Sequence, residues 1–389
     1  MYSRKLFLSL GAAALAIAMA ASSAEAKSNA APSAQSRAQA TMAPTNDLAS
    51  NPYLVKVNKN KSTTYDTTKF KKSPPYTIAL AAQGPTNSWA TLFDAHARWE
   101  VGQVGPTVVK TLLYADANGS ADKQVPEVED LLSQNPDALI LTPMSSAALS
   151  ASVERAMAQG VPVILCASPV DTDNYVTEIG TDLVRLGTSH ANWLVQQLNG
   201  KGNIVVMDGI PGVGTAELAK LGAQSIWAQN PGIKVLDEQY GQWDVATAKK
   251  IMEGWIAKYG KDINGIWSNG AQMSQGIISA YLDAKLPIPP LAGGEYSNGF
   301  LRLAAENKVT FQAVQYPPSM SALCVDTAVK ILQGQPVKRF IDIQDAFPGS
   351  QDFTDKDIAK FFNAKWTDDV FGPVLMPDSE LGKLGYLKK

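Results

Sequence analysis

The feature that most constrains the fold is a short apolar run, Tyr76–Ala82, followed by the polar loop Gln83–Thr86. The run is too short for a helix and lacks the alternation of a half-exposed strand, so it predicts a strand buried on both faces of a parallel sheet. Asn87 or Ser88 can cap a helix that begins near Trp89. The loop therefore lies at the carboxyl end of a strand, where open α/β sheets bind their ligands.

Strand and helix patterns alternate from Tyr76 to Ile343, and this order predicts an α/β fold with parallel sheets. One pattern occurs twice: the strand at Asp137–Thr142 and the strand at Ile263–Ser268 are each followed by a helix, a turn with proline and another strand. We therefore expect two similar, doubly wound lobes.

The first 26 residues have the composition of a secretory signal peptide. Arg4 and Lys5 precede an apolar run from Leu6 to about Ala21, and Ala24–Ala26 offers small residues for cleavage. The run is too short to span a membrane, and no cysteine lies near the cleavage point to carry a lipid. We expect an exported protein without a lipid anchor.

Residues 27–75 are rich in Ala, Ser, Asn, Thr and Lys and show little periodicity, which indicates a low-complexity spacer without a fold of its own. Within it, Asn51–Val57 either forms a short strand or docks on the folded domain.

Charge and cysteine content exclude two classes of protein. The net charge of −2 is too close to balance for a nucleic-acid partner. The two cysteines, Cys166 and Cys324, are too few for a disulfide scaffold. They could pair in an oxidising compartment, but each lies in an apolar segment where a free core cysteine is common, and we favour two unpaired thiols.

Motifs for catalysis are sparse. His96 and His190 are single histidines within helical segments, no spacing suits a metal, and no Gly-x-Ser-x-Gly motif is present. The stretch Gly209–Gly214 follows a strand but matches neither glycine-rich phosphate motif, so it predicts a tight turn beside a cleft. We expect neither a metal nor a cofactor.

Hydrogen-bonding and aromatic residues instead follow one strand after another. Because the carboxyl ends of parallel strands meet at one edge, these residues predict a binding cleft. They are Asn87, Trp89, Thr142, Ser168, Trp243-Asp244, Asn269, Glu295-Tyr296 and Gln315-Tyr316.

Several segments resemble the ribose/galactose-type (type I) periplasmic sugar-binding proteins of ABC importers. The matching segments are Thr77–Leu80 with Asn87–Trp89, Asp137–Pro143, Val161–Val163, Gly209–Gly212, Asn230–Val235 and Lys330–Gly334. The resemblance covers about Tyr76 to Ile343. It implies two lobes joined by three crossings that close around one ligand.

From the resemblance we place the first lobe at 76–180 plus 316–343, the second at 181–315 plus 344–370, and a C-terminal tail at 371–389. The resemblance, together with the strand-end positions, gives the predicted ligand-binding residues: Asn87, Trp89, Thr142, Ser168, Glu217, Trp243, Asn269, Glu295 and Gln315.

The sequence departs from the family pattern at charged positions. Ala167-Ser168 replaces an Asp-Arg pair, Glu217 replaces an arginine, and Gly270 stands where an asparagine is expected. Arginine provides a rigid fork of donors for a small sugar, and its loss makes a plain ribose binder an unsuitable model.

The resemblance implies a non-enzymatic periplasmic protein that delivers a sugar or polyol to an ABC permease. Three alternatives remain open. A ligand with an amine would pair with Glu217 and Glu295. The same two carboxyls could serve an exported carbohydrate-active enzyme, given a suitable separation. A sensory role would replace the permease by a chemoreceptor.

Overall fold

The computed structural model describes residues 48–347 and 352–389. The predicted signal peptide and the first part of the predicted spacer, residues 27–47, lie outside the described residues. Within the described ranges, no helix combines the length and the apolar character needed to cross a bilayer.

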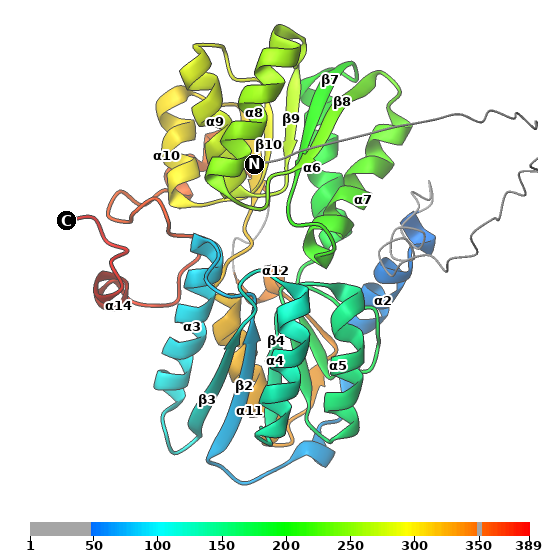
Figure 1. Cartoon of the computed structure of the whole chain (residues 1–389), viewed down its shortest axis with the longest axis vertical. Helices are drawn as coiled ribbons and strands as arrows, with labels where there is room; N and C mark the ends of the chain where they lie inside the picture. The colour runs from blue at the N-terminus through cyan, green and yellow to red at the C-terminus, as the bar shows by residue number, and fades with distance from the viewer. Residues whose placement is uncertain (1–47, 348–351) are drawn as a thin grey trace, which may run out of the picture.

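Two six-stranded sheets form the centres of two lobes, which lie one above the other in Figure 1. The first sheet has the order β13-β6-β5-β4-β2-β3 and is parallel throughout. Its strands are β2 (Tyr76–Ala82), β3 (Val109–Asp116), β4 (Ala138–Leu141), β5 (Val163–Cys166), β6 (Thr177–Gly180) and β13 (Phe340–Asp342).

The second sheet has the order β14-β11-β10-β9-β7-β8. It is parallel except for β14, which pairs with β11 in the antiparallel sense. Its strands are β7 (Gly202–Asp208), β8 (Ile233–Tyr240), β9 (Gly265–Ser268), β10 (Leu291–Glu295), β11 (Phe311–Val314) and β14 (Phe353–Thr354).

Helices cover the sheets of both lobes. In the first lobe they are α3 (Ser88–Val104), α4 (Ala121–Ser133), α5 (Ser146–Ala158) and α11 (Met320–Leu332). In the second they are α6 (Leu183–Gln197), α7 (Gly214–Gln229), α8 (Val245–Tyr259), α9 (Ala271–Ala284) and α10 (Asn298–Asn307). The predicted class, α/β with two doubly wound parallel-sheet lobes, is confirmed.

The chain crosses between the lobes three times: from β6 to α6, from β11 to α11, and from β13 through α12 (Ile343–Ala346) to β14. Such a triple connection is the predicted three-stranded hinge. The crossings fall near the predicted lobe limits, and the limits themselves stay a prediction.

The prediction of a spacer is wrong for residues 48–75. Pro52–Lys61 forms helix α2, and β1 (Thr64–Tyr65) pairs with β12 (Val337–Lys338). Asn51 caps α2 and Pro52 occupies its first turn, while Val57 is fully buried. The expected strand at Asn51–Val57 is therefore a helix, and the alternative that this segment docks is confirmed.

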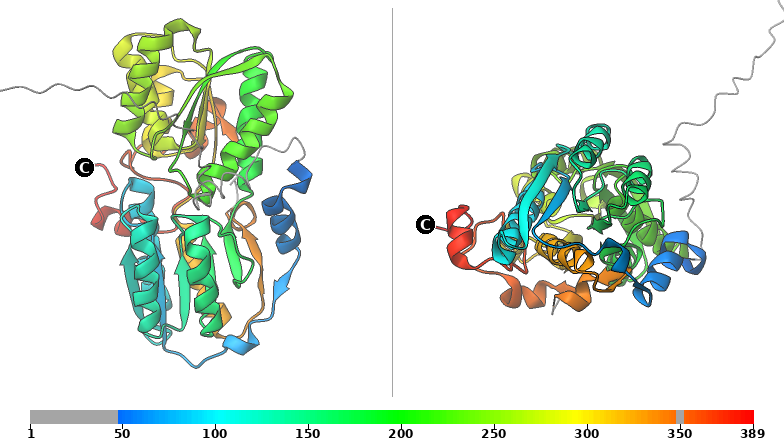
Figure 2. Two further views of the ribbon diagram at one scale, coloured as in Figure 1. Left: turned by 45° about the vertical axis from the view of Figure 1, so that its right-hand side comes forward. Right: turned by 90° about the horizontal axis from the view of Figure 1, so that it is seen from below.

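Helix α2 packs beside the first crossing, on the side of the molecule opposite α14 (Asp378–Lys383) (Figures 1 and 2). The Tyr53 hydroxyl lies 3.4 Å from Glu178 Oε1 and 3.3 Å from the Thr181 carbonyl oxygen, both near the end of β6. Contacts with residues more than a hundred positions away stabilise the segment, and its local composition does not encode them.

The two cysteines are paired, which corrects the expectation of free thiols. Cys166 ends β5, and Cys324 lies in α11, which packs across that strand. Both side chains are fully buried with a Cα–Cα distance of 6.5 Å. The helix-on-sheet packing of the first lobe therefore places the two thiols in bonding position.

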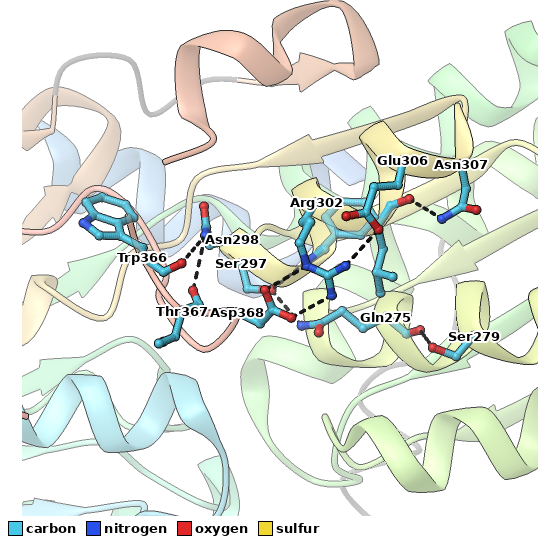
Figure 3. A network of polar contacts seen from close by, with 12 residues as sticks. Gln275, Ser279, Ser297, Asn298, Arg302, Glu306, Asn307, Trp366, Thr367 and Asp368 are labelled. Atoms are coloured by element: carbon cyan, nitrogen blue, oxygen red, sulfur yellow. Dashed lines mark hydrogen bonds and ion pairs between the residues drawn. The ribbon is translucent and has the colours of Figure 1, made fainter. Parts of the chain in front are cut away.

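The C-terminal segment folds onto both lobes. Figure 3 shows its attachment to α10, where the Arg302 guanidinium holds Asp368 through two hydrogen bonds of 3.0 and 2.7 Å. From there Asp369 accepts a hydrogen bond of 2.6 Å from Ser88 in the first lobe. Leu381, within the predicted tail, is fully buried in α14.

Candidate ligand-binding site

The carboxyl ends of the strands of both sheets face one cavity between the lobes. The empty space in it is about 640 Å³, open solvent at the mouth included. It is lined by Gln83, Asn87, Trp89, Thr142, Pro143, Ala167 and Ser168 from the first lobe, by Leu186, Val213, Thr215, Trp243, Asn269, Gln272 and Glu295 from the second, and by Tyr316 from a crossing.

Two indoles line the cavity, and backbone carbonyl oxygens of the protein engage their N–H groups. Trp89 Nε1 donates to the carbonyl oxygen of Tyr316 at 2.8 Å, and its ring stacks on Tyr316 with centroids 6.0 Å apart. Trp243 Nε1 donates to the carbonyl oxygen of Asn269 at 2.5 Å. These hydrogen bonds hold each ring in a fixed orientation beside the cavity.

Trp243 lies in a slot between two glycines. A Cβ atom at Gly209 would approach its Cε2 to 2.3 Å, and one at Gly270 would approach its Cδ1 to 2.6 Å. The indole can occupy this place because both neighbours lack side chains. The replacement of the expected asparagine by Gly270 therefore makes room for the aromatic wall.

Tyr316 joins the two lobes at the second crossing. Its hydroxyl donates to the carbonyl oxygen of Ala167, which also accepts from the Thr215 hydroxyl at 3.1 Å. Burial raises the pKa of Tyr316 above its usual range, so it remains a neutral donor. Ala167 adopts a φ of 69°, a left-handed conformation that turns its carbonyl toward these donors.

Three buried polar side chains on the wall have atoms without a hydrogen-bond partner among the described residues. They are Thr142 Oγ1 and Ser168 Oγ from the first lobe, and both amide atoms of Gln272 from the second. Such atoms are costly to bury unpaired, so both lobes present groups that a ligand can satisfy.

Glu295 is the only charged residue among the described residues that line the cavity. Burial raises its pKa to about 7, against hydrogen bonds from its own N–H and that of Ala271. With no lysine or arginine among the described residues of the wall, this lining offers no counter-charge to an anion.

A buried ion cluster supports Asn269 from behind. The Asn269 amide donates to Asp208 Oδ1 at 2.9 Å, and Asp208 Oδ2 lies 3.0 Å from Lys220 Nζ. Lys220 also contacts Glu238 at 3.1 Å and the Tyr240 hydroxyl at 2.8 Å. Burial alone would lower the pKa of Lys220, but Asp208 and Tyr240 more than offset it and raise that pKa above its usual range.

The family model of the periplasmic binding protein domain matches residues 78–336. The chain belongs to this family. Two relatives with established names are similar to this chain. A xylitol-binding protein of Mycolicibacterium smegmatis is 28% identical over 183 residues, or 47% of this chain and 52% of that protein. The ribose import binding protein of Bacillus subtilis is 26% identical over 266 residues, or 68% and 85% of the two chains.

The solved structure of a solute binding protein of an ABC transporter from Bacillus halodurans, with bound myo-inositol, shares the fold of this periplasmic binding protein. It is 21% identical with a TM-score of 0.67, and the match covers 74% of this chain and 98% of that one.

Seven of the nine predicted site residues of this periplasmic binding protein line the cavity; Glu217 and Gln315 do not. Glu217 lies in the first turn of α7, where its Oε1 accepts from the N–H of Gly212 at 3.1 Å. The Gly212 amide, which belongs to the predicted tight turn, therefore donates to Glu217 and not to a ligand. Ligand contact by any of the nine stays a prediction.

Sequence reasoning missed Gln272. It looked for functional residues at strand ends, whereas Gln272 lies in the first turn of the helix that follows β9. The available signal was a polar residue three positions after Asn269, on the turn that faces the same edge of the sheet.

Proposed function

We propose that the protein is the periplasmic solute-binding component of an ABC importer and captures an uncharged sugar or polyol between its lobes. The relatives described above support the class, since one is named for xylitol and another for ribose. Export by the predicted signal peptide would bring the protein to the periplasm.

The observation that carries the proposal is the neutral polar lining of the cavity. Unpaired atoms of Thr142, Ser168 and Gln272 come from opposite lobes, and the indoles of Trp89 and Trp243 line the same cavity. A sugar or polyol has hydroxyls for the former and C–H surfaces for the latter. A bound ligand would thus join the lobes through its own hydrogen bonds.

The same lining argues against anionic ligands. A sugar phosphate or sugar acid would be buried beside Glu295 without a lysine or arginine on the described wall, and an unpaired buried charge is strongly unfavourable. A ligand with an amine remains the second candidate, because Glu295 could supply its counter-charge.

An enzymatic role for Glu217 and Glu295 has less support. Glu217 accepts from the Gly212 amide and lies 3.8 Å from Lys220, and it is not among the residues that line the cavity. The closed form would instead present a joint surface of both lobes to a partner. We propose a permease as that partner; the fructose-binding periplasmic domain of a hybrid two-component system has a similar fold, so a sensor is the alternative.

A thermal-shift screen of the protein from residue 27 onward tests the proposal. Neutral sugars and polyols should raise the melting temperature, since a ligand at 100 times its Kd adds about 2.7 kcal/mol to the stability. Sugar phosphates should not. Mass spectrometry should recover the bound compound unchanged; turnover would favour the enzyme.

Ser168→Ala should weaken binding, whereas the control Ser279→Ala should not, because the Ser279 hydroxyl is paired with the Gln275 carbonyl oxygen on α9 (Figure 3). A folded protein that no neutral sugar or polyol stabilises would contradict the proposal.

A further inference from the structure

Gln272 has a buried primary amide that no other group of the described chain satisfies. The side chain is 3% exposed, and neither Nε2 nor Oε1 has a hydrogen-bond partner. A primary amide offers two donor hydrogens and two acceptor lone pairs. Because the residue lines the cavity, these four positions are available to a ligand.

A second buried glutamine has both ends of its amide paired. Gln124 is fully buried, its Nε2 donates to the Thr142 carbonyl oxygen at 2.9 Å, and its Oε1 accepts from the Met144 N–H at 2.8 Å. Both ends of that amide are satisfied inside the first lobe. Gln272 differs in that it lines the cavity while no group of the described chain satisfies either end of its amide.

The other side-chain donors on the second-lobe wall are already engaged. Asn269 Nδ2 donates to Asp208, Trp243 Nε1 donates to the Asn269 carbonyl oxygen, and the Thr215 hydroxyl donates to Ala167. The carboxyl of Glu295 receives the N–H of Ala271. Among the described residues of this wall, Gln272 therefore has the side-chain N–H group that can still donate a hydrogen bond to a ligand.

The geometry of an amide restricts what can satisfy it. Its oxygen and nitrogen share one carbon, so two ligand groups that bind them must also lie side by side. Hydroxyls on neighbouring carbons meet this requirement, and since a hydroxyl both donates and accepts, such a pair fits the amide in either orientation.

Building on the proposed function, we infer that Gln272 determines specificity by binding two hydroxyls on adjacent carbons of a neutral sugar or polyol. One hydroxyl donates to Oε1 and the other accepts from Nε2. A compound that lacks either hydroxyl leaves half of the amide buried and unpaired, and its affinity falls roughly 10- to 100-fold.

The test combines variants with ligand analogues. Xylitol, D-ribose, myo-inositol and glycerol are first titrated into the wild-type protein by calorimetry. The compound that binds is then compared with its mono-deoxy analogues, one for each carbon. The same titrations are made with Gln272→Met, which keeps the side-chain size, and with Gln275→Met as the matched control. Gln275 lies one turn further along α9 and its amide donates to Ser297 (Figure 3).

We expect two of the mono-deoxy analogues to bind the wild type roughly 10- to 100-fold more weakly than the parent compound, and the hydroxyls that these two analogues lack should lie on adjacent carbons. Gln272→Met should bind the parent compound more weakly by a similar factor and no longer distinguish those two analogues. Gln275→Met should match the wild type. If Gln272→Met does not fold, Gln272→Glu keeps an acceptor and loses the donor, so it should keep sensitivity at one of the two carbons.

Two kinds of failure are distinct. If none of the four compounds binds the folded wild type, the proposed function is wrong and this inference falls with it. If one binds but Gln272→Met retains its affinity, or the sensitive carbons are not neighbours, the proposed function stands and the role of Gln272 is refuted.

Discussion

Replacing Lys220 by methionine should destabilise the second lobe far more than removing a surface lysine. The Lys220 side chain is 10% exposed and lies 3.0 Å from Asp208, whose side chain is fully buried. Breaking a buried ion pair by removing one partner costs about 3–5 kcal/mol, because the other charge is left uncompensated. At roughly 2–4 °C per kcal/mol for a domain of this size, the melting temperature should fall on the order of 10 °C.

The deficit should depend on pH. Burial already raises the pKa of Asp208, and Lys220 opposes that rise. Without Lys220 the folded-state pKa of Asp208 rises further above its unfolded value of about 3.9. The folded variant then binds a proton more tightly than the unfolded chain, so its stability increases as pH falls. The gap to the wild type should narrow between pH 8 and pH 5.

Thermal unfolding followed by tryptophan fluorescence at pH 8 and at pH 5 measures both effects. The matched control is Lys249→Met, which removes an exposed ion pair. Lys249 Nζ lies only 2.6 Å from Asp283 Oδ2, but the two side chains are 36% and 62% exposed. The control should melt close to the wild type at both pH values, because solvent screens exposed pairs. Equal losses in the two variants, or a Lys220→Met deficit independent of pH, would refute the reasoning.

Three further predictions concern the disulfide, the indole slot and the cavity carboxyl. Cys324→Ser should cost about 2–5 kcal/mol, measured by urea unfolding, because the bond spans 158 residues; reductant should then have no further effect. Gly270→Asn should cost about 1–3 kcal/mol by displacing Trp243 and should weaken binding, whereas Gly254→Ala, with open space around it, should stabilise α8 by about 0.5–1 kcal/mol. Because burial raises the folded-state pKa of Glu295 to about 7, from about 4.3 when unfolded, stability should fall as pH rises between these values, and Glu295→Gln should remove that dependence in urea midpoints.

The sequence predicted the elements whose cause is local. The buried run at Tyr76–Ala82 forms β2 as expected, and Asn87 caps α3 with its Oδ1 accepting from the Ala90 N–H at 2.9 Å. The carboxyl ends of parallel strands lie at one edge of a sheet. The positions of Trp89, Trp243 and Glu295 after predicted strands were therefore enough to predict that they share one cavity.

Features that depend on distant partners could not be predicted in this way. Helix α2 is weakly apolar and is held by contacts such as that of Tyr53 with Glu178, 125 residues away. The pairing of the cysteines depends on how α11 crosses β5. Glu217 was placed in the site by analogy with an arginine, but a shorter acidic side chain finds a local partner at Gly212.

The unpaired polar atoms also bear on how closure is coupled to binding. Thr142 Oγ1, Ser168 Oγ and the two amide atoms of Gln272 are buried between the lobes. At about 1–3 kcal/mol for each unpaired group, closure without a ligand is disfavoured by several kcal/mol. A ligand that satisfies all of these groups binds the closed form more tightly than the open form by a free energy of the same size. A difference of about 5.5 kcal/mol suffices to move a two-state equilibrium from 1:99 to 99:1.

Removing these groups should therefore close the free protein while weakening its binding. We expect the combined variant Thr142→Val, Ser168→Ala and Gln272→Met to have a smaller radius of gyration than the free wild type in small-angle X-ray scattering, near that of the ligand-bound wild type. Its affinity for the ligand should fall, because the gained closure does not replace the lost hydrogen bonds. A variant that binds weakly yet stays as extended as the free wild type would show that desolvation of these groups does not hold the lobes apart.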